Sequence, residues 1–330
     1  MTTREEDEKW MRRCLQLALG GTEHAAPNPM VGAVIVHRGR IIGEGCHVRC
    51  GEGHAEVNAL RAVKDVDRPL LRESTIYVSL EPCAHYGRTP PCARLIAEVG
   101  IGRVVVGCID PFARVQGRGV AILREAGAEV VTGVLEAECR ALNRRFFTVQ
   151  ERHRPFVTLK WARSADGFLD RRRTPDEAPA RLSTPLSRLH AHRLRALHEA
   201  IAVGHTTLTA DRPRLDVRHW DGPSPQRFVV GRPAPGELPE GFRAAESPEA
   251  LLRLLQAEGV QTLLVEGGRR TLQSFLDAGL WDEAWEETAT LVLGDGVAAP
   301  VVPPGVVRTA MTRLGAAFTL YRNPRPAGLD

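Results

Sequence analysis

The chain has 330 residues, which is long enough for two domains of about 150 residues each. Its 43% hydrophobic and 25% charged residues are typical of a soluble globular protein, and its net charge of only +4 argues against a nucleic-acid or membrane-surface protein. The charged N-terminus lacks the apolar run of a signal peptide, and no stretch approaches the roughly 18 apolar residues of a spanning helix. We therefore expect a cytoplasmic protein that binds neither nucleic acid nor a membrane.

The first half of the chain alternates helical and strand patterns. We predict helices over 6–19, 54–64, 92–98, 117–126 and 136–147. We predict strands over 31–37, 40–43, 75–80, 103–108 and 129–132. A strand hairpin followed by β-α units predicts a three-layer α/β/α sandwich around a mostly parallel sheet.

The polar segment 151–155 ends in proline, so we place the domain boundary there and expect domains over 1–150 and 151–330. In the second domain we predict helices over 184–197, 247–257 and 270–278. We predict strands over 156–162, 199–203, 227–230 and 261–265. The charged, proline-rich stretches 170–181 and 218–240 are typical of surface loops.

Seven cysteines all lie in the first 139 residues. Because their number is odd and the chain is large, we expect reduced thiols and no disulfide framework. Cys83 follows a predicted strand, whereas Cys92 and His54 open predicted helices. Two thiolates and one imidazole are a ligand set that zinc uses at catalytic sites, with the fourth position left open. The sequence therefore predicts a zinc site in the first domain.

Glu56 lies two positions after His54, where it is free to move protons instead of binding the metal. The order His-x-Glu, then Pro-Cys and a second Cys, is the pattern of zinc-dependent deaminases, although eight residues separate these cysteines where many deaminases have two. A structural zinc closed by a fourth ligand such as His85 is the alternative. Such a site would have no use for Glu56, so we favour catalysis.

Arg88 lies in the loop between the two cysteines. A guanidinium there is placed to bind an anionic part of a substrate, most plausibly a phosphate. The alternative is an ordinary solvated arginine.

Four stretches, 26–36, 43–60, 77–92 and 107–119, resemble the deaminase domain of the bifunctional riboflavin-biosynthesis deaminase–reductase family. The resemblance implies a cytidine-deaminase-like domain that hydrolytically deaminates 2,5-diamino-6-ribosylamino-4(3H)-pyrimidinone 5′-phosphate. It implies that Glu56 is the proton shuttle and that the zinc ligands are His54, Cys83 and Cys92. It also implies four residues that line the substrate pocket: Asn28, His47, Arg88 and Asp110.

The second half resembles the reductase domain of the same family over 155–167, 193–211, 213–218 and 263–276. The resemblance implies a dihydrofolate-reductase-like α/β fold in which NADPH reduces the ribosyl side chain to ribityl. It implies cofactor contacts at Thr207, Asp211 and Gly268. It implies substrate contacts at Arg195, Leu215, Arg218 and Glu266.

The second half departs from the family pattern at two places. Arg212 stands where the family has Asp or Asn, and 181–183 reads Arg-Leu-Ser where the family has Trp-Ile-Thr. A deaminase with a catalytically degenerate C-terminal domain, used as a scaffold or binding module, is therefore the alternative. The family is typically oligomeric through its reductase half, so we expect a homo-oligomer.

Overall fold

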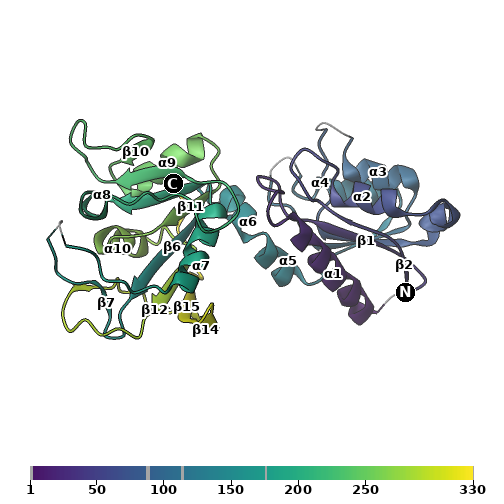
Figure 1. Cartoon of the computed structure of the whole chain (residues 1–330). Coiled ribbons are helices and arrows are strands. Elements are labelled where there is room, and N and C mark those ends of the chain that lie inside the picture. The colour runs from purple at the N-terminus through teal and green to yellow at the C-terminus, as the bar shows by residue number, and fades with distance from the viewer. Residues whose placement is uncertain (1–2, 87–89, 113–114, 175–176, 330) are drawn as a thin grey trace. The chain divides into compact units, whose positions relative to one another are not determined.

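The computed structural model of the chain describes residues 3–86, 90–112, 115–174 and 177–329. By its internal contacts the chain divides into two compact units, Met1–Gln150 and Glu151–Asp330 (Figure 1). Within the described residues, no helix is long and apolar enough to cross a membrane.

The first unit contains a five-stranded sheet in the order β2-β1-β3-β4-β5. Its strands are β1 (Gly32–His37), β2 (Arg40–Cys46), β3 (Thr75–Leu80), β4 (Arg103–Cys108) and β5 (Glu129–Thr132). Its helices are α1 (Arg4–Ala18), α2 (Ala55–Ala62), α3 (Cys92–Val99), α4 (Arg118–Glu125), α5 (Glu136–Leu142) and α6 (Arg144–Arg152), with 3-10 turns η1 (Leu19–Gly21) and η2 (Asp65–Glu73).

Alternate residues of the central strands point to opposite faces of this sheet, so two cores form. On one face Ile35, Val78 and Val104 pack with residues of α2, α3 and α4. On the other face Val34 and Tyr77 pack with residues of α1 and α5. The predicted three layers are therefore present. The sheet is mixed, because β1 pairs antiparallel with both β2 and β3.

The single helix predicted over 136–147 is two helices, α5 and α6, separated at Asn143. The Asn143 side chain accepts a hydrogen bond from the Met30 backbone N–H and donates one to the Met30 carbonyl, both at 2.8 Å. This contact with a distant segment coincides with the end of α5, and a local helical pattern cannot reveal it.

The second unit contains an eight-stranded sheet in the order β10-β9-β8-β11-β6-β12-β15-β14. Its strands are β6 (Phe156–Arg163), β8 (Ala200–Gly204), β9 (Gln226–Val230), β10 (Phe242–Ala245), β11 (Thr262–Val265), β12 (Glu283–Thr288), β14 (Val307–Arg313) and β15 (Ala316–Arg322). A small separate sheet pairs β7 (Phe168–Asp170) with β13 (Val297–Ala298). Its helices are α7 (Pro185–Ala196), α8 (His205–Asp211), α9 (Pro248–Ala257) and α10 (Arg269–Asp277).

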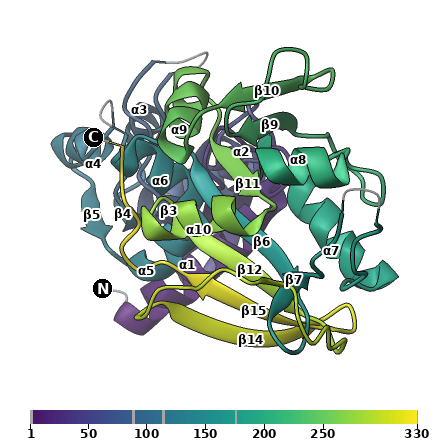
Figure 2. The ribbon, with the colours of Figure 1, turned by 90° about the vertical axis from the view of Figure 1, so that its left-hand side faces the viewer.

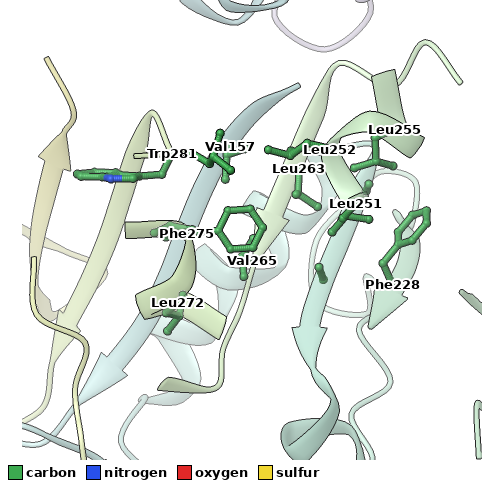
Figure 3. Close-up of a cluster of buried hydrophobic side chains, with 14 of the residues drawn as sticks. Val157, Phe228, Leu251, Leu252, Leu255, Leu263, Val265, Leu272, Phe275 and Trp281 are labelled. Atoms are coloured by element: carbon green, nitrogen blue, oxygen red, sulfur yellow. The ribbon is translucent and has the colours of Figure 1, made fainter. Parts of the chain in front are cut away.

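In the order of the sheet, the neighbouring strands β10, β9, β8, β11, β6 and β12 are parallel. The hairpin of β15 and β14 completes the sheet, with β15 antiparallel to both β12 and β14. Figure 2 shows α9 and α10 on one side of this sheet and α7 and α8 on the other. The main core lies under α9 and α10, where Leu251 and Phe275 pack on Val157, Leu263 and Val265 (Figure 3). Because the strands run parallel, the carboxyl ends of β6, β8 and β11 meet at one edge, where open α/β sheets bind ligands.

Candidate active sites

Three metal-binding side chains of the first unit converge from three elements. His54 is the N-cap residue of α2, Cys83 follows β3, and Cys92 is the first residue of α3. Both thiols approach the Nδ1 atom of His54, Cys83 Sγ at 3.6 Å and Cys92 Sγ at 3.4 Å. The three ligand atoms all lie within 4.8 Å of one another.

This donor set fits zinc. Two sulfurs and one imidazole nitrogen are ligands that zinc takes at catalytic sites. Among the residues that the structure describes, no further His, Cys, Asp or Glu joins the group. His85, the fourth ligand of the structural alternative, instead packs its ring edge against Phe112 at 5.8 Å. The geometry therefore leaves room for an open coordination position.

The two cysteine side chains shift each other: Cys92 lowers the pKa of Cys83, whereas Cys83 and burial raise the pKa of Cys92. The backbone N–H of Cys92 also donates to Cys83 Sγ at 3.3 Å. A deprotonated sulfur is the form that binds a metal.

Glu56 lies on the first turn of α2 and is only 3% exposed. Burial raises the pKa of its carboxyl group to about 7, although His54 opposes the shift. The carboxylate is not a member of the ligand group, so it remains available for proton transfer beside the metal site.

His47 and Asn28 are brought together next to this group. His47 Nε2 lies 3.1 Å from the Asn28 amide nitrogen, and His47 Nδ1 lies 3.1 Å from the Gly53 carbonyl oxygen. The carbonyl can only accept, so Nδ1 carries the proton and Nε2 accepts from Asn28. Burial lowers the pKa of His47, which favours this neutral form. Its ring contacts the His54 ring edge-on at 5.4 Å.

Asp110 follows β4 and is 7% exposed. Burial raises the pKa of its carboxyl group to about 6, and its Oδ1 atom accepts a hydrogen bond from the Phe112 N–H at 2.8 Å. Arg88, the residue predicted to contact a phosphate, lies outside the described residues.

Sequence reasoning missed Asn58, whose amide nitrogen donates to the carbonyls of Cys46 and Gly53 at 2.9 and 3.0 Å. These bonds fix the loop that leads into His54. The sequence feature that could have indicated this role is the place of Asn58, four residues after His54 and one turn along the same helix.

In the second unit the predicted substrate residues Arg195 and Glu266 form a bidentate ion pair, with nitrogen–oxygen distances of 2.9 and 2.6 Å. Arg195 projects from α7, and Glu266 follows β11. Burial opposes ionisation of Glu266, but Arg195 outweighs it, so the pKa of Glu266 lies below its usual value. The Arg195 guanidinium is therefore already engaged by Glu266.

The other two predicted substrate residues lie beside this pair. Arg195 also donates to the Asp216 carbonyl at 3.0 Å, and Leu215 is buried just before it. Arg218 pairs through its guanidinium with the Asp216 carboxylate, and its backbone N–H donates to His192 at 3.1 Å. The structure thus brings Arg195, Leu215, Arg218 and Glu266 into one neighbourhood.

The predicted cofactor residues Thr207 and Gly268 meet where α8 and α10 begin. A Cβ atom on Gly268 would lie 2.7 Å from Thr207 Oγ1, and one on Gly204 would lie 2.2 Å from Thr271 Oγ1. Both glycines therefore lie where the starts of the two helices approach closely. Unpaired N–H groups at a helix start suit an anionic ligand such as a dinucleotide phosphate. Asp211 lies one turn after Thr207 on α8 and pairs with Arg173.

The segment that replaces Trp-Ile-Thr is anchored by a residue that the sequence did not single out. Ser183 and Ser187 donate to the two oxygens of Glu287 at 2.6 and 2.5 Å. Glu287 lies on β12 and is 1% exposed. This buried carboxylate holds the start of α7, the helix that presents Arg195.

Two family domains match the chain. Residues 4–108 match the cytidine and deoxycytidylate deaminase zinc-binding region, and residues 155–318 match the RibD C-terminal domain. The chain is 36% identical to the riboflavin biosynthesis protein RibD of Aquifex aeolicus (strain VF5) over 328 residues, which cover 89% of this chain and 90% of that protein. The chain belongs to the RibD family.

Further similar proteins support the same family. The riboflavin biosynthesis protein RibD of Escherichia coli (strain K12) is 33% identical, with 92% of this chain and 93% of that protein covered. The structure is similar to that of a diaminohydroxyphosphoribosylaminopyrimidine deaminase/5-amino-6-(5-phosphoribosylamino)uracil reductase from Thermotoga maritima, with a TM-score of 0.84, 32% identity and coverage of 97% of this chain and 99% of that chain. Acinetobacter baumannii RibD gives a TM-score of 0.85 at 30% identity, with 98% of this chain and all of that chain covered.

These matches confirm the predicted family, the two fold classes and the fusion of a zinc-binding deaminase with a reductase of riboflavin biosynthesis. The predicted cofactors, zinc for the deaminase domain and NADPH for the RibD reductase domain, agree with them. The alternative of a C-terminal scaffold is not favoured by a RibD C-terminal domain that matches from 155 to 318.

Proposed function

We propose that residues 1–150 form a zinc-dependent pyrimidine deaminase domain and residues 151–330 an NADPH-dependent reductase domain. The first would remove the ring 2-amino group of 2,5-diamino-6-ribosylamino-4(3H)-pyrimidinone 5′-phosphate by hydrolysis, and the second would then reduce its ribosyl side chain to ribityl. The observation that supports this most is the convergence of His54, Cys83 and Cys92 beside the buried Glu56.

For the first step we assign His54, Cys83 and Cys92 as the zinc ligands. When bound, zinc supplies Lewis acidity that makes water nucleophilic near neutral pH. Glu56 is buried on the same helical turn as His54 and is not a ligand, so it is placed to transfer a proton from water to the departing ammonia. The net change replaces the ring C–NH₂ group by a carbonyl, with one water consumed and one ammonia released.

Asn28, His47 and Asp110 are assigned to the deaminase substrate pocket. His47 is held neutral between Asn28 and the Gly53 carbonyl, so the pair offers polar groups of fixed orientation. Arg88 is assigned to the substrate phosphate on the strength of its charge and its place between the cysteines.

For the reduction we assign Arg195, Leu215, Arg218 and Glu266 to the substrate. We assign Thr207, Asp211 and Gly268 to the cofactor. NADPH supplies the hydride when bound. The Arg195–Glu266 pair holds two charged groups at the carboxyl end of β11, and the close contact of Thr207 with Gly268 places two helix starts beside them. Location in the cytoplasm and assembly through the reductase half remain predictions.

The direct test is ammonia release from the diaminopyrimidine substrate by purified wild-type and Glu56→Gln proteins, with zinc content measured in both. We expect the variant to retain zinc and to lose roughly 10²–10⁴-fold in rate, the usual contribution of proton transfer. Glu98→Gln, at an exposed position on α3, is the matched control and should behave as wild type. Undiminished turnover in Glu56→Gln would remove Glu56 from the mechanism.

A further inference from the structure

Glu81 lies between the end of β3 and the Pro82-Cys83 turn and is 3% exposed. Its backbone N–H donates to the Cys108 carbonyl at 2.9 Å, which extends the pairing of β3 with β4. Glu81 therefore joins the metal-ligand loop to the end of β4, where the loop with Asp110 begins.

The Glu81 carboxylate accepts three backbone hydrogen bonds from the segment that follows β4 and from the first turn of α4. Its Oε2 atom accepts from the N–H groups of Asp110 at 3.2 Å and Gly117 at 2.9 Å. Its Oε1 atom accepts from the Val120 N–H at 3.1 Å. A buried carboxylate with three N–H donors is strongly held, because hydrogen bonds to a carboxylate are stronger than hydrogen bonds to a neutral acceptor.

Glu81 also caps the N-terminus of α4, where the helix has no capping side chain of its own. The N-cap residue of α4 is Gly117, which has no side chain to accept from the first N–H groups of the helix. A carboxylate at this end is favoured by the helix dipole as well. Gly119 shows how close the approach is, since a Cβ atom there would lie 2.0 Å from the Pro82 carbonyl oxygen.

We propose that Glu81 is a positioning residue for deamination, which fixes Asp110 relative to Cys83. The inference rests on the proposed function, in which Asp110 contacts the substrate and Cys83 binds zinc. The Asp110 carboxylate accepts from the Phe112 N–H, so its position follows the backbone that Glu81 holds. Loss of the Glu81 carboxylate should weaken substrate binding without removing zinc.

The test compares wild type with Glu81→Gln, which keeps the shape of the side chain but turns one acceptor into an N–H₂ donor. Asp7→Asn is the matched control, because Asp7 is a buried carboxylate that pairs with Arg103 on the α1 face of the same unit. The measurements are KM and kcat for ammonia release, zinc content, urea unfolding, and hydrogen exchange of the Asp110, Gly117 and Val120 amides.

We expect KM to rise roughly tenfold or more in Glu81→Gln, with wild-type zinc content and faster exchange of the three amides. Asp7→Asn should lower stability and leave KM unchanged. Active wild type together with unchanged KM in Glu81→Gln would overturn the inference, as would zinc loss that accounts for the lost activity. Inactive wild type would instead overturn the proposed function.

Discussion

At the scale of single residues, His190 shows that a buried titratable group need not belong to a catalytic site. It lies on α7 with its ring against Trp285 and Phe318, at 4.6 and 4.9 Å between ring centres. Within the part of the chain that the structure describes, neither ring nitrogen has a hydrogen-bond partner. Burial lowers the pKa of His190 to about 4. Three nearby cations add to this effect: Arg313, Lys160 and Arg193.

This depressed pKa predicts a loss of stability in acid. The unfolded chain binds a proton at His190 near pH 6.5, whereas the folded protein resists it until about pH 4. The free energy of unfolding should therefore fall by about 3 kcal/mol between these pH values from this group alone. His190→Phe keeps an aromatic ring in the site and should remove that part of the pH dependence.

Urea unfolding of both proteins at pH 6.5 and pH 4 measures the difference. Other groups titrate in both proteins, so the informative quantity is the difference between wild type and variant in how much the free energy of unfolding changes with pH. An identical pH dependence in the two would show that His190 is protonated in the folded protein at little cost.

At the scale of elements, Asn143 holds the segment before β1 against the break between α5 and α6. Its two hydrogen bonds satisfy both the N–H and the carbonyl of Met30, and Asn143 is 3% exposed. Asn143→Ala leaves both groups without this partner, so we expect a loss of about 2 kcal/mol of unfolding free energy.

Chemical unfolding measures the free energy of unfolding of wild type and Asn143→Ala. Asn143→Asp is a second variant that removes only one of the two hydrogen bonds. Aspartate can still accept from the Met30 N–H but cannot donate to its carbonyl, so its stability should lie below wild type. A wild-type midpoint in Asn143→Ala would mean that the two hydrogen bonds to Met30 do not stabilise the fold.

The elements differ in how well the sequence predicts them. Strands such as β3 and β4 read as apolar runs between turn residues, and their predicted bounds agree with the structure. β12 was not predicted because it reads Glu-Ala-Trp-Glu-Glu-Thr, a pattern without an apolar face. Its glutamates are buried only because distant partners satisfy them, such as Ser183 and Ser187 for Glu287 and Trp161 for Glu286.

The two candidate sites also differ in how well the sequence predicts them. His54, Cys83 and Cys92 could be predicted because their residue types and their places at strand and helix ends already indicate a metal site. The Arg195–Glu266 pair could not, since it joins residues 71 apart, and only the resemblance singled out either one. Glu81 and Glu287 act through contacts with distant backbone or hydroxyl groups, which no local pattern shows.

At the scale of the whole molecule, each unit has its own hydrophobic core. Removal of zinc should therefore abolish ammonia release and leave NADPH oxidation with the deaminated substrate unchanged. Both activities of one preparation, assayed before and after chelation and again after zinc is restored, give the comparison. Loss of both activities on chelation would mean that the reductase unit depends on the metal site for its fold.

We propose that one imidazole and two thiolates of the first unit hold a single zinc ion with one position left open. X-ray absorption at the zinc edge of the purified chain tests it most directly. We predict two sulfur scatterers, with nitrogen or oxygen in the remaining positions, and one sulfur fewer in Cys83→Ser. Zinc that keeps two sulfurs in Cys83→Ser, or a chain that binds no zinc, would contradict the account.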